Sequence, residues 1–71
     1  MSKTSAKGSE VARHVSHLRE MIVTLSRDAR LTVGRVTDPK AQALFETTAE
    51  VLDGLEKAYA DFEEHDEEAW K

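Results

Sequence analysis

The sequence predicts an all-α protein: an antiparallel two-helix hairpin that dimerises into a four-helix bundle. Three observations lead to this fold. Two long segments repeat apolar residues at steps of three and four, a short segment with glycine and proline separates them, and the apolar stripe is wider than one helix contact needs. With 71 residues and no cysteine, the chain is at most one domain and has no disulfide to stabilise it.

The first helix is expected over residues 9–33, after a flexible arm at residues 1–8. Ser9 fits the N-cap position, and Gly34 fits the position just beyond the helix end. The apolar residues that recur at heptad spacing are Val11, Val15, Leu18, Ile22, Leu25 and Ala29. This spacing places them along one face of the helix.

The second helix is expected over residues 38–68, after a turn at residues 34–37. Thr37 or Asp38 can cap it, and Pro39 fits the first helical position. Gly54 lies inside it, at a cost of about 1 kcal/mol relative to alanine. Its apolar repeat consists of Ala41, Phe45, Thr48, Leu52, Leu55, Tyr59 and Phe62.

The short connection predicts that the helices lie side by side in opposite directions. We expect Leu52 and Leu55 to pack at the centre of the hairpin. Apolar residues beside the repeat widen the stripe: Met21, Leu44, Val51 and Ala58. A stripe of this width indicates a second neighbour, which a twofold dimer would supply. The expected core of the hairpin or dimer is Val15, Leu18, Ile22, Leu25, Phe45, Leu52, Leu55, Tyr59 and Phe62.

The two halves of the chain carry opposite charge. Residues 1–37 have a formal charge of +4 and residues 38–71 a formal charge of −8. We therefore expect ion pairs across the hairpin, which individually stabilise little but favour one alignment. The expected pairs are Arg19 with Asp53 or Glu56, Arg27 with Glu46, Arg13 with Asp61, and Lys7 with Asp66. The other acids of the second helix are interpreted as a solvated outer face.

The segment DPKAQALFETTAE resembles the carboxylate helices of ferritin-like, rubrerythrin-type bundles. The resemblance implies a similar mode of helix packing. In that family the helix leads into a Glu-x-x-His ligand pair, but this chain has Leu52 and Leu55 at the corresponding positions. The resemblance therefore does not extend to the di-iron activity of that family.

Two further residue sets suggest alternative roles. Glu10 with His14, and Asp61 with His65, have the spacing of two-ligand metal chelates, and a metal shared between subunits would need both pairs. The residues that we consider for binding a partner are Arg13, Arg19, Arg27, Arg30 and Trp70. The four arginines share a basic side of the first helix, which is a pattern that can follow phosphates.

The leading interpretation is a small non-enzymatic interaction or structural module, an adaptor or regulator that acts as a homodimer and binds a further protein. No cofactor is expected. The alternatives are a metal-handling bundle with ligands shared between subunits, and a nucleic-acid-binding dimer that uses the basic side of the first helix. Because the sequence has neither a secretory signal nor a long apolar run, we expect a cytoplasmic protein without membrane contact.

Overall fold

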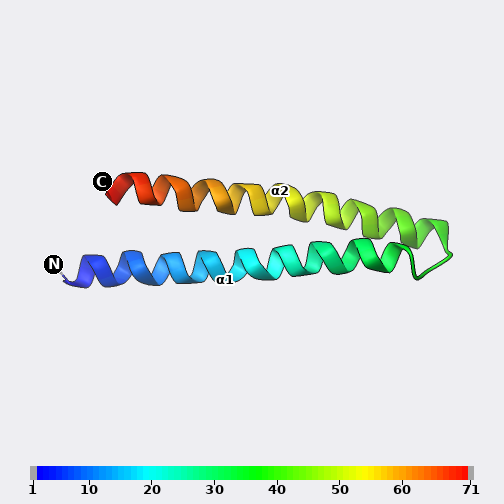
Figure 1. Ribbon diagram of the computed structural model, residues 1–71, viewed down its shortest axis with the longest axis horizontal. Helices are drawn as coiled ribbons and strands as arrows, with labels where there is room; N and C mark the ends of the chain where they lie inside the picture. Colours follow the sequence, from blue (N-terminus) through cyan, green and yellow to red (C-terminus); the bar gives the residue numbers. More distant parts are fainter. Residues whose placement is uncertain (1, 71) are drawn as a thin grey trace.

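The chain folds into two long helices that lie side by side in opposite directions (Figure 1). The computed structural model describes the backbone of residues 2–70 and the side chains of residues 10–65. Helix α1 spans Ser2–Val33 and helix α2 spans Pro39–Trp70, and no strand occurs in the described backbone. The molecule measures 56 × 16 × 13 Å. The predicted all-α helical hairpin is confirmed.

Both helices are longer than the sequence pattern predicts. The backbone of residues 2–8, expected as a flexible arm, is helical, and α2 continues to Trp70 rather than ending near residue 68. Residues 2–8 include Lys3, Ala6 and Lys7, which favour helix, while a single glycine at position 8 costs only about 1 kcal/mol. Hydrophobic periodicity cannot detect such an extension, because the segment has no apolar repeat.

Helix α1 ends in a tightened turn. The amide of Gly34 donates to the carbonyl of Leu31 at 3.2 Å, and the amide of Arg35 donates to that of Thr32 at 2.9 Å. These three-residue steps satisfy carbonyls that the helix end would otherwise leave without partners. Gly34 does not have a positive φ, so the helix does not end in the left-handed glycine conformation that its position suggested.

Two side chains fix the connection between the helices. Asp38 caps α2, since its Oδ1 accepts a hydrogen bond from the amide of Lys40 at 3.0 Å. Gln42, in the first turn of α2, reaches back to the end of α1. Its Nε2 donates to the carbonyl of Val36 at 2.8 Å and to that of Val33 at 3.2 Å. Gln42 therefore joins the start of α2 to the end of α1.

The helix contact follows a seam with two rows of residues on each helix. The first row matches the predicted repeat and is half-buried or buried: Val15, Ile22 and Ala29 from α1, with Phe45, Leu52 and Tyr59 from α2. The second row contains small and polar residues. The most buried described side chains are Ala49, Ser26 and Ala29, at 0%, 5% and 9% exposure. Small residues let the two backbones approach closely there.

Part of the expected core of the hairpin or dimer is not buried within one hairpin. Leu18, Leu25, Leu55 and Phe62 are 44–53% exposed in the single chain. Leu55 in particular does not lie at the hairpin centre. The reason is rotation: both helices turn their small and polar row toward each other, which moves these four apolar side chains to the edge of the contact. Their burial in a dimer stays a prediction.

Gly54 offers a test of how open the outer side of α2 is. It is exposed, and a Cβ added there meets no atom within 4 Å. We expect Gly54→Ala to stabilise the protein by about 0.5–1 kcal/mol through helix propensity alone, as measured by urea unfolding. The reciprocal change Ala43→Gly, at another exposed position of α2, should lose a similar amount. A loss of stability in Gly54→Ala would show that something packs against the glycine.

Candidate functional site

One broad side of the hairpin exposes large apolar side chains along both helices, and we call it the apolar face. Leu18 and Leu25 flank Ile22, four residues before it and three after it. On each helix a row of apolar residues lies beside the seam, rotated from it in the same sense. Because both helices are right-handed and run in opposite directions, these two rows lie on the same side of the hairpin. The exposed members of the apolar face are Val11, Leu18, Met21, Leu25, Leu44, Val51, Leu55 and Phe62.

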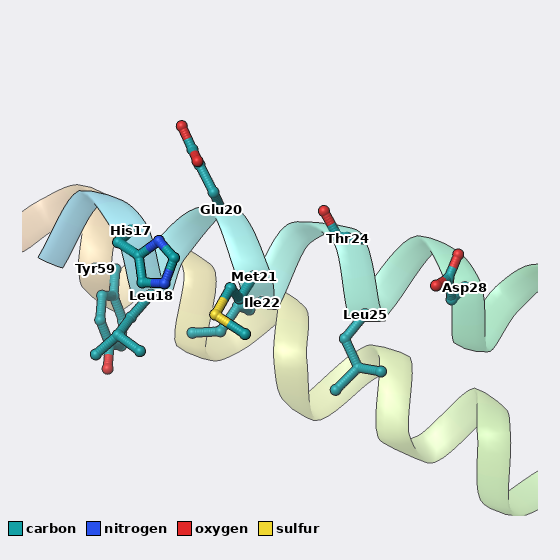
Figure 2. A pocket seen from close by; sticks show the side chains of 9 residues that line it. All are labelled: His17, Leu18, Glu20, Met21, Ile22, Thr24, Leu25, Asp28 and Tyr59. Carbon is teal, nitrogen blue, oxygen red and sulfur yellow. The ribbon is translucent and has the colours of Figure 1, made fainter. Parts of the chain in front are cut away.

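The apolar face is hollowed into shallow grooves. The larger groove, of about 640 Å³, lies beside α1. Its apolar and aromatic lining is Leu18, Met21, Ile22, Leu25 and, from α2, Tyr59, and its polar lining is His17, Glu20, Thr24 and Asp28. Figure 2 shows Leu18, Met21, Leu25 and Tyr59 gathered on one side of α1, while Glu20 points away from them.

A second groove of about 320 Å³ follows toward the loop, and its apolar lining is Leu25, Ala29, Leu44 and Phe45. Leu25 lines both grooves. The hollow therefore continues along the seam rather than forming an enclosed pocket for a small molecule.

The opposite side of the hairpin carries a polar network of Arg19, Ser26, Arg30, Asp53, Glu56 and Glu63. Toward the open end, Arg19 joins two carboxylates of α2. Its Nε donates to Glu56 Oε2 at 2.9 Å, and its Nη1 donates to Glu63 Oε1 at 2.8 Å. Arg19 thus bridges two turns of the other helix.

Toward the loop, Asp53 is the centre of the polar network. Its Oδ1 accepts a hydrogen bond from the buried Ser26 hydroxyl at 2.7 Å, and its Oδ2 accepts one from Arg30 Nη2 at 2.7 Å. Arg30 Nη1 also donates to Ser26 Oγ at 3.0 Å, which closes a three-residue ring. This ring holds the rotation of α1 relative to α2, because all three groups must face the same flank.

Electrostatics in the polar network agree with this geometry. The hydrogen bond to Glu56, then the one to Glu63, raises the pKa of Arg19 above its ordinary value. The hydrogen bond to Asp53 likewise raises the pKa of Arg30. Arg30, followed by Ser26, lowers the pKa of Asp53 below its ordinary value of 3.8. Since these charges are open to solvent, the network acts mainly by selecting one alignment of the helices.

The expected ion pairs are partly confirmed. Arg19 pairs with Glu56, as predicted, but Asp53 pairs with Arg30 instead. Among residues 10–65, neither Arg27 with Glu46 nor Arg13 with Asp61 forms an ion pair. The expected pair of Lys7 and Asp66 lies outside the residues whose side chains are described.

The residues of the two predicted metal-binding pairs are exposed on both helices. Glu10 and His14 lie on α1, Asp61 and His65 lie on α2, and all four are exposed. No group of three or more His, Asp or Glu side chains within residues 10–65 is arranged to hold a metal ion.

The basic side of α1 is divided. Arg19 and Arg30 bind carboxylates of α2, while Arg13 and Arg27 are exposed. Trp70 lies outside the described side chains. The surface that the structure brings together is therefore the apolar face, not a basic stripe.

Sequence reasoning missed Ser26, Ala49 and Gln42, and it considered Arg30 for binding a partner rather than for pairing with Asp53. The signal for the first two was present: each follows a seam residue, Ile22 or Phe45, by four positions, where a small side chain lets helices approach. Arg30 and Gln42 act through long side chains whose reach depends on the rotation of the helices and the path of the loop, and no spacing rule supplies either.

Comparisons with protein-family models, curated proteins and solved structures find no match for this chain. In the part of the chain that the structure describes, neither helix has a stretch long and apolar enough to cross a membrane.

The lowered pKa of Asp53 predicts a pH-dependent contribution to stability. A carboxyl group whose pKa is lowered by folding stabilises the folded state fully when the pH is above its ordinary pKa of 3.8. This stabilisation is lost as the pH falls through the lowered pKa. The gap in unfolding free energy between the parent and Asp53→Asn should therefore be largest near neutral pH and shrink below about pH 4.

Urea unfolding across this pH range checks the prediction. Asp61→Asn, an exposed change on the same helix, serves as the control and should show a smaller gap. A gap for Asp53→Asn that stays constant with pH would contradict the role of its charge.

Proposed function

We propose that this chain is a small non-enzymatic interaction module that works as a homodimer. Two hairpins pair through their apolar faces into a four-helix bundle, and the outer surfaces of the bundle are left for a further protein partner. The role is that of an adaptor or structural regulator. The observation that carries the proposal is the apolar face: eight large apolar side chains exposed along one side of a two-helix protein.

The first support is the extent of exposed apolar surface. Soluble monomers rarely expose a contiguous apolar patch of more than a few hundred Å² unless it is a binding surface. The apolar face follows both helices and is interrupted by few charges, whereas the polar network occupies the other side of the same seam. Such a division indicates that one side meets protein and the other meets water.

The second support is the small core of the single hairpin. Within residues 10–65, no large side chain is fully buried. Chains of this size generally need oligomerisation, a metal or disulfides to gain stability, and this sequence has no cysteine. Covering the apolar face would also bury the open sides of Val15, Ile22, Phe45, Leu52 and Tyr59, which are only half-buried in one hairpin.

The third support concerns the charged residues. The three groups with shifted pKa values are Arg19, Arg30 and Asp53, and each is paired across the seam in the open polar network. Ion pairs of this kind align helices. Acid–base catalysis instead uses titratable groups in a partly desolvated cleft near a substrate, so the polar network favours a structural role.

Sedimentation equilibrium at micromolar concentration tests the proposal. We expect a dimer, and we expect Leu25→Glu to raise the dimer dissociation constant by at least about 100-fold, because the change removes two buried leucine side chains per dimer. The matched control is Leu31→Glu. Leu31 and Leu25 are on the same helix and have nearly equal exposure, 54% and 53%, but Leu31 does not lie on the apolar face.

A glutamate at position 31 would have Arg27 and Arg35 one turn away on either side, so this control should remain dimeric. A stably folded parent of 8.0 kDa in sedimentation would contradict the proposal. Equal weakening by both variants would contradict the assignment of the dimer contact to the apolar face.

A further inference from the structure

We propose that the second copy covers the apolar face in one defined orientation. A twofold axis perpendicular to the helices passes beside Met21, so that α1 packs on α1 of the partner and α2 packs on α2 of the partner. The two loops then lie at opposite ends of the bundle. This inference rests on the proposed homodimer and specifies its arrangement.

A second hairpin fits the apolar face in size. In Figure 1 the two helices lie side by side in the plane that contains the 56 Å and 16 Å dimensions of the molecule. The apolar face is parallel to that plane. Its exposed members run from Val11 to Leu25 on α1 and from Leu44 to Phe62 on α2, which corresponds to about 21 Å and about 27 Å of helix. A short peptide would leave much of this length uncovered, whereas a second hairpin has the same length and the same apolar rows.

The orientation is decided by the residues at the outer edges of the apolar face. On α1 this edge is formed by His14, Met21 and Asp28, each seven residues apart. On α2 it is formed by Leu44, Val51, Ala58 and His65. The α1 edge is apolar only in its middle, while the α2 edge is apolar over its first three members. The two edges therefore require different neighbours.

The α1 edge is complementary to a reversed copy of itself. When two such edges meet in opposite directions, Met21 faces the partner's Met21, and His14 faces the partner's Asp28. The imidazole can donate a hydrogen bond to the carboxylate, and this pair forms twice by symmetry. If α1 instead faced α2 of the partner, Asp28 would lie against Leu44 or Val51 and lose water without gaining a hydrogen-bond partner.

The α2 edge also matches a reversed copy of itself. Val51 then faces the partner's Ala58, a large side chain against a small one, again formed twice. His65 faces the partner's Leu44 near the ends of the contact. The acids of α2 do not oppose this pairing directly, because Glu50 and Glu64 share the outer side of the helix with Lys57 and are exposed to solvent.

One axis has to serve both helices. The reversed α1 edge is symmetric about Met21, and the reversed α2 edge is symmetric about a point between Gly54 and Leu55. Across the hairpin, Arg19 bonds to Glu56 and Glu63, and Ser26 bonds to Asp53. Counted along both helices, these three bonds place Met21 on average level with Ala58. The two symmetry centres therefore lie within about one helical turn, or about 5.4 Å, of each other.

Single-cysteine variants test the arrangement, because the chain has no cysteine of its own. We expect Met21→Cys, oxidised or treated with a short bismaleimide, to form covalent dimers at least tenfold faster than Leu44→Cys or Val23→Cys. Leu44 lies far from its own copy in this orientation, and Val23 is exposed on the side of the polar network. Sedimentation of each reduced variant confirms that it still dimerises.

The outcomes separate this inference from the proposed function. Reduced variants that are dimeric, with slow cross-linking of Met21→Cys but efficient cross-linking in a mixture of Met21→Cys and Val51→Cys, would overturn the orientation and leave the homodimer standing. Dimeric variants in which neither combination cross-links would also overturn it. Folded monomers throughout would overturn both proposals.

Discussion

The rotation of each helix about its own axis decides which side chains the hairpin buries and which it exposes. Ser26, Arg30 and Asp53 form a ring of hydrogen bonds that can close only when one flank of α1 faces the matching flank of α2. Ala49, fully buried, lets the backbones approach at the same flank. Once small and polar residues occupy one row of the seam, Leu18, Leu25 and Leu55 of the repeat lie outside it. The apolar face is therefore a consequence of the polar network.

The hairpin itself could be predicted from the sequence, and its rotation could not. Heptad spacing is shared by every residue of a stripe, so it shows that Ile22 and Leu52 face a neighbour but not which flank turns inward. The pattern assigned Leu25 and Leu55 to the core of the hairpin or dimer because leucine is apolar. The structure places Ser26 and Glu56, their immediate neighbours in the chain, at the seam instead. Apolar pattern alone cannot distinguish a contact within one chain from a contact between two.

In the loop, too, one feature could be predicted from the sequence and another could not. Asp38 and Pro39 were identifiable as a helix start because capping is local in sequence, and the cap is present. Gln42 could not be assigned a role from local rules, since its amide reaches carbonyls six and nine residues earlier. The same holds for the candidate site. The width of the apolar stripe could be predicted from the sequence. The grooves beside Tyr59 and Phe45 could not, because they depend on how the two helices are rotated.

The absence of any fully buried large side chain within residues 10–65 bears on how long such a protein survives in a cell. A folded state with little interior opens readily, and proteases act on the opened chain. Anything that binds only the folded hairpin shifts this balance by mass action, and the shift grows with the concentration of the binder. If the binder is another copy, newly made chains are degraded quickly when scarce and persist when abundant. The abundance of the protein then has a threshold, which is set by how tightly two apolar faces bind rather than by a separate regulator.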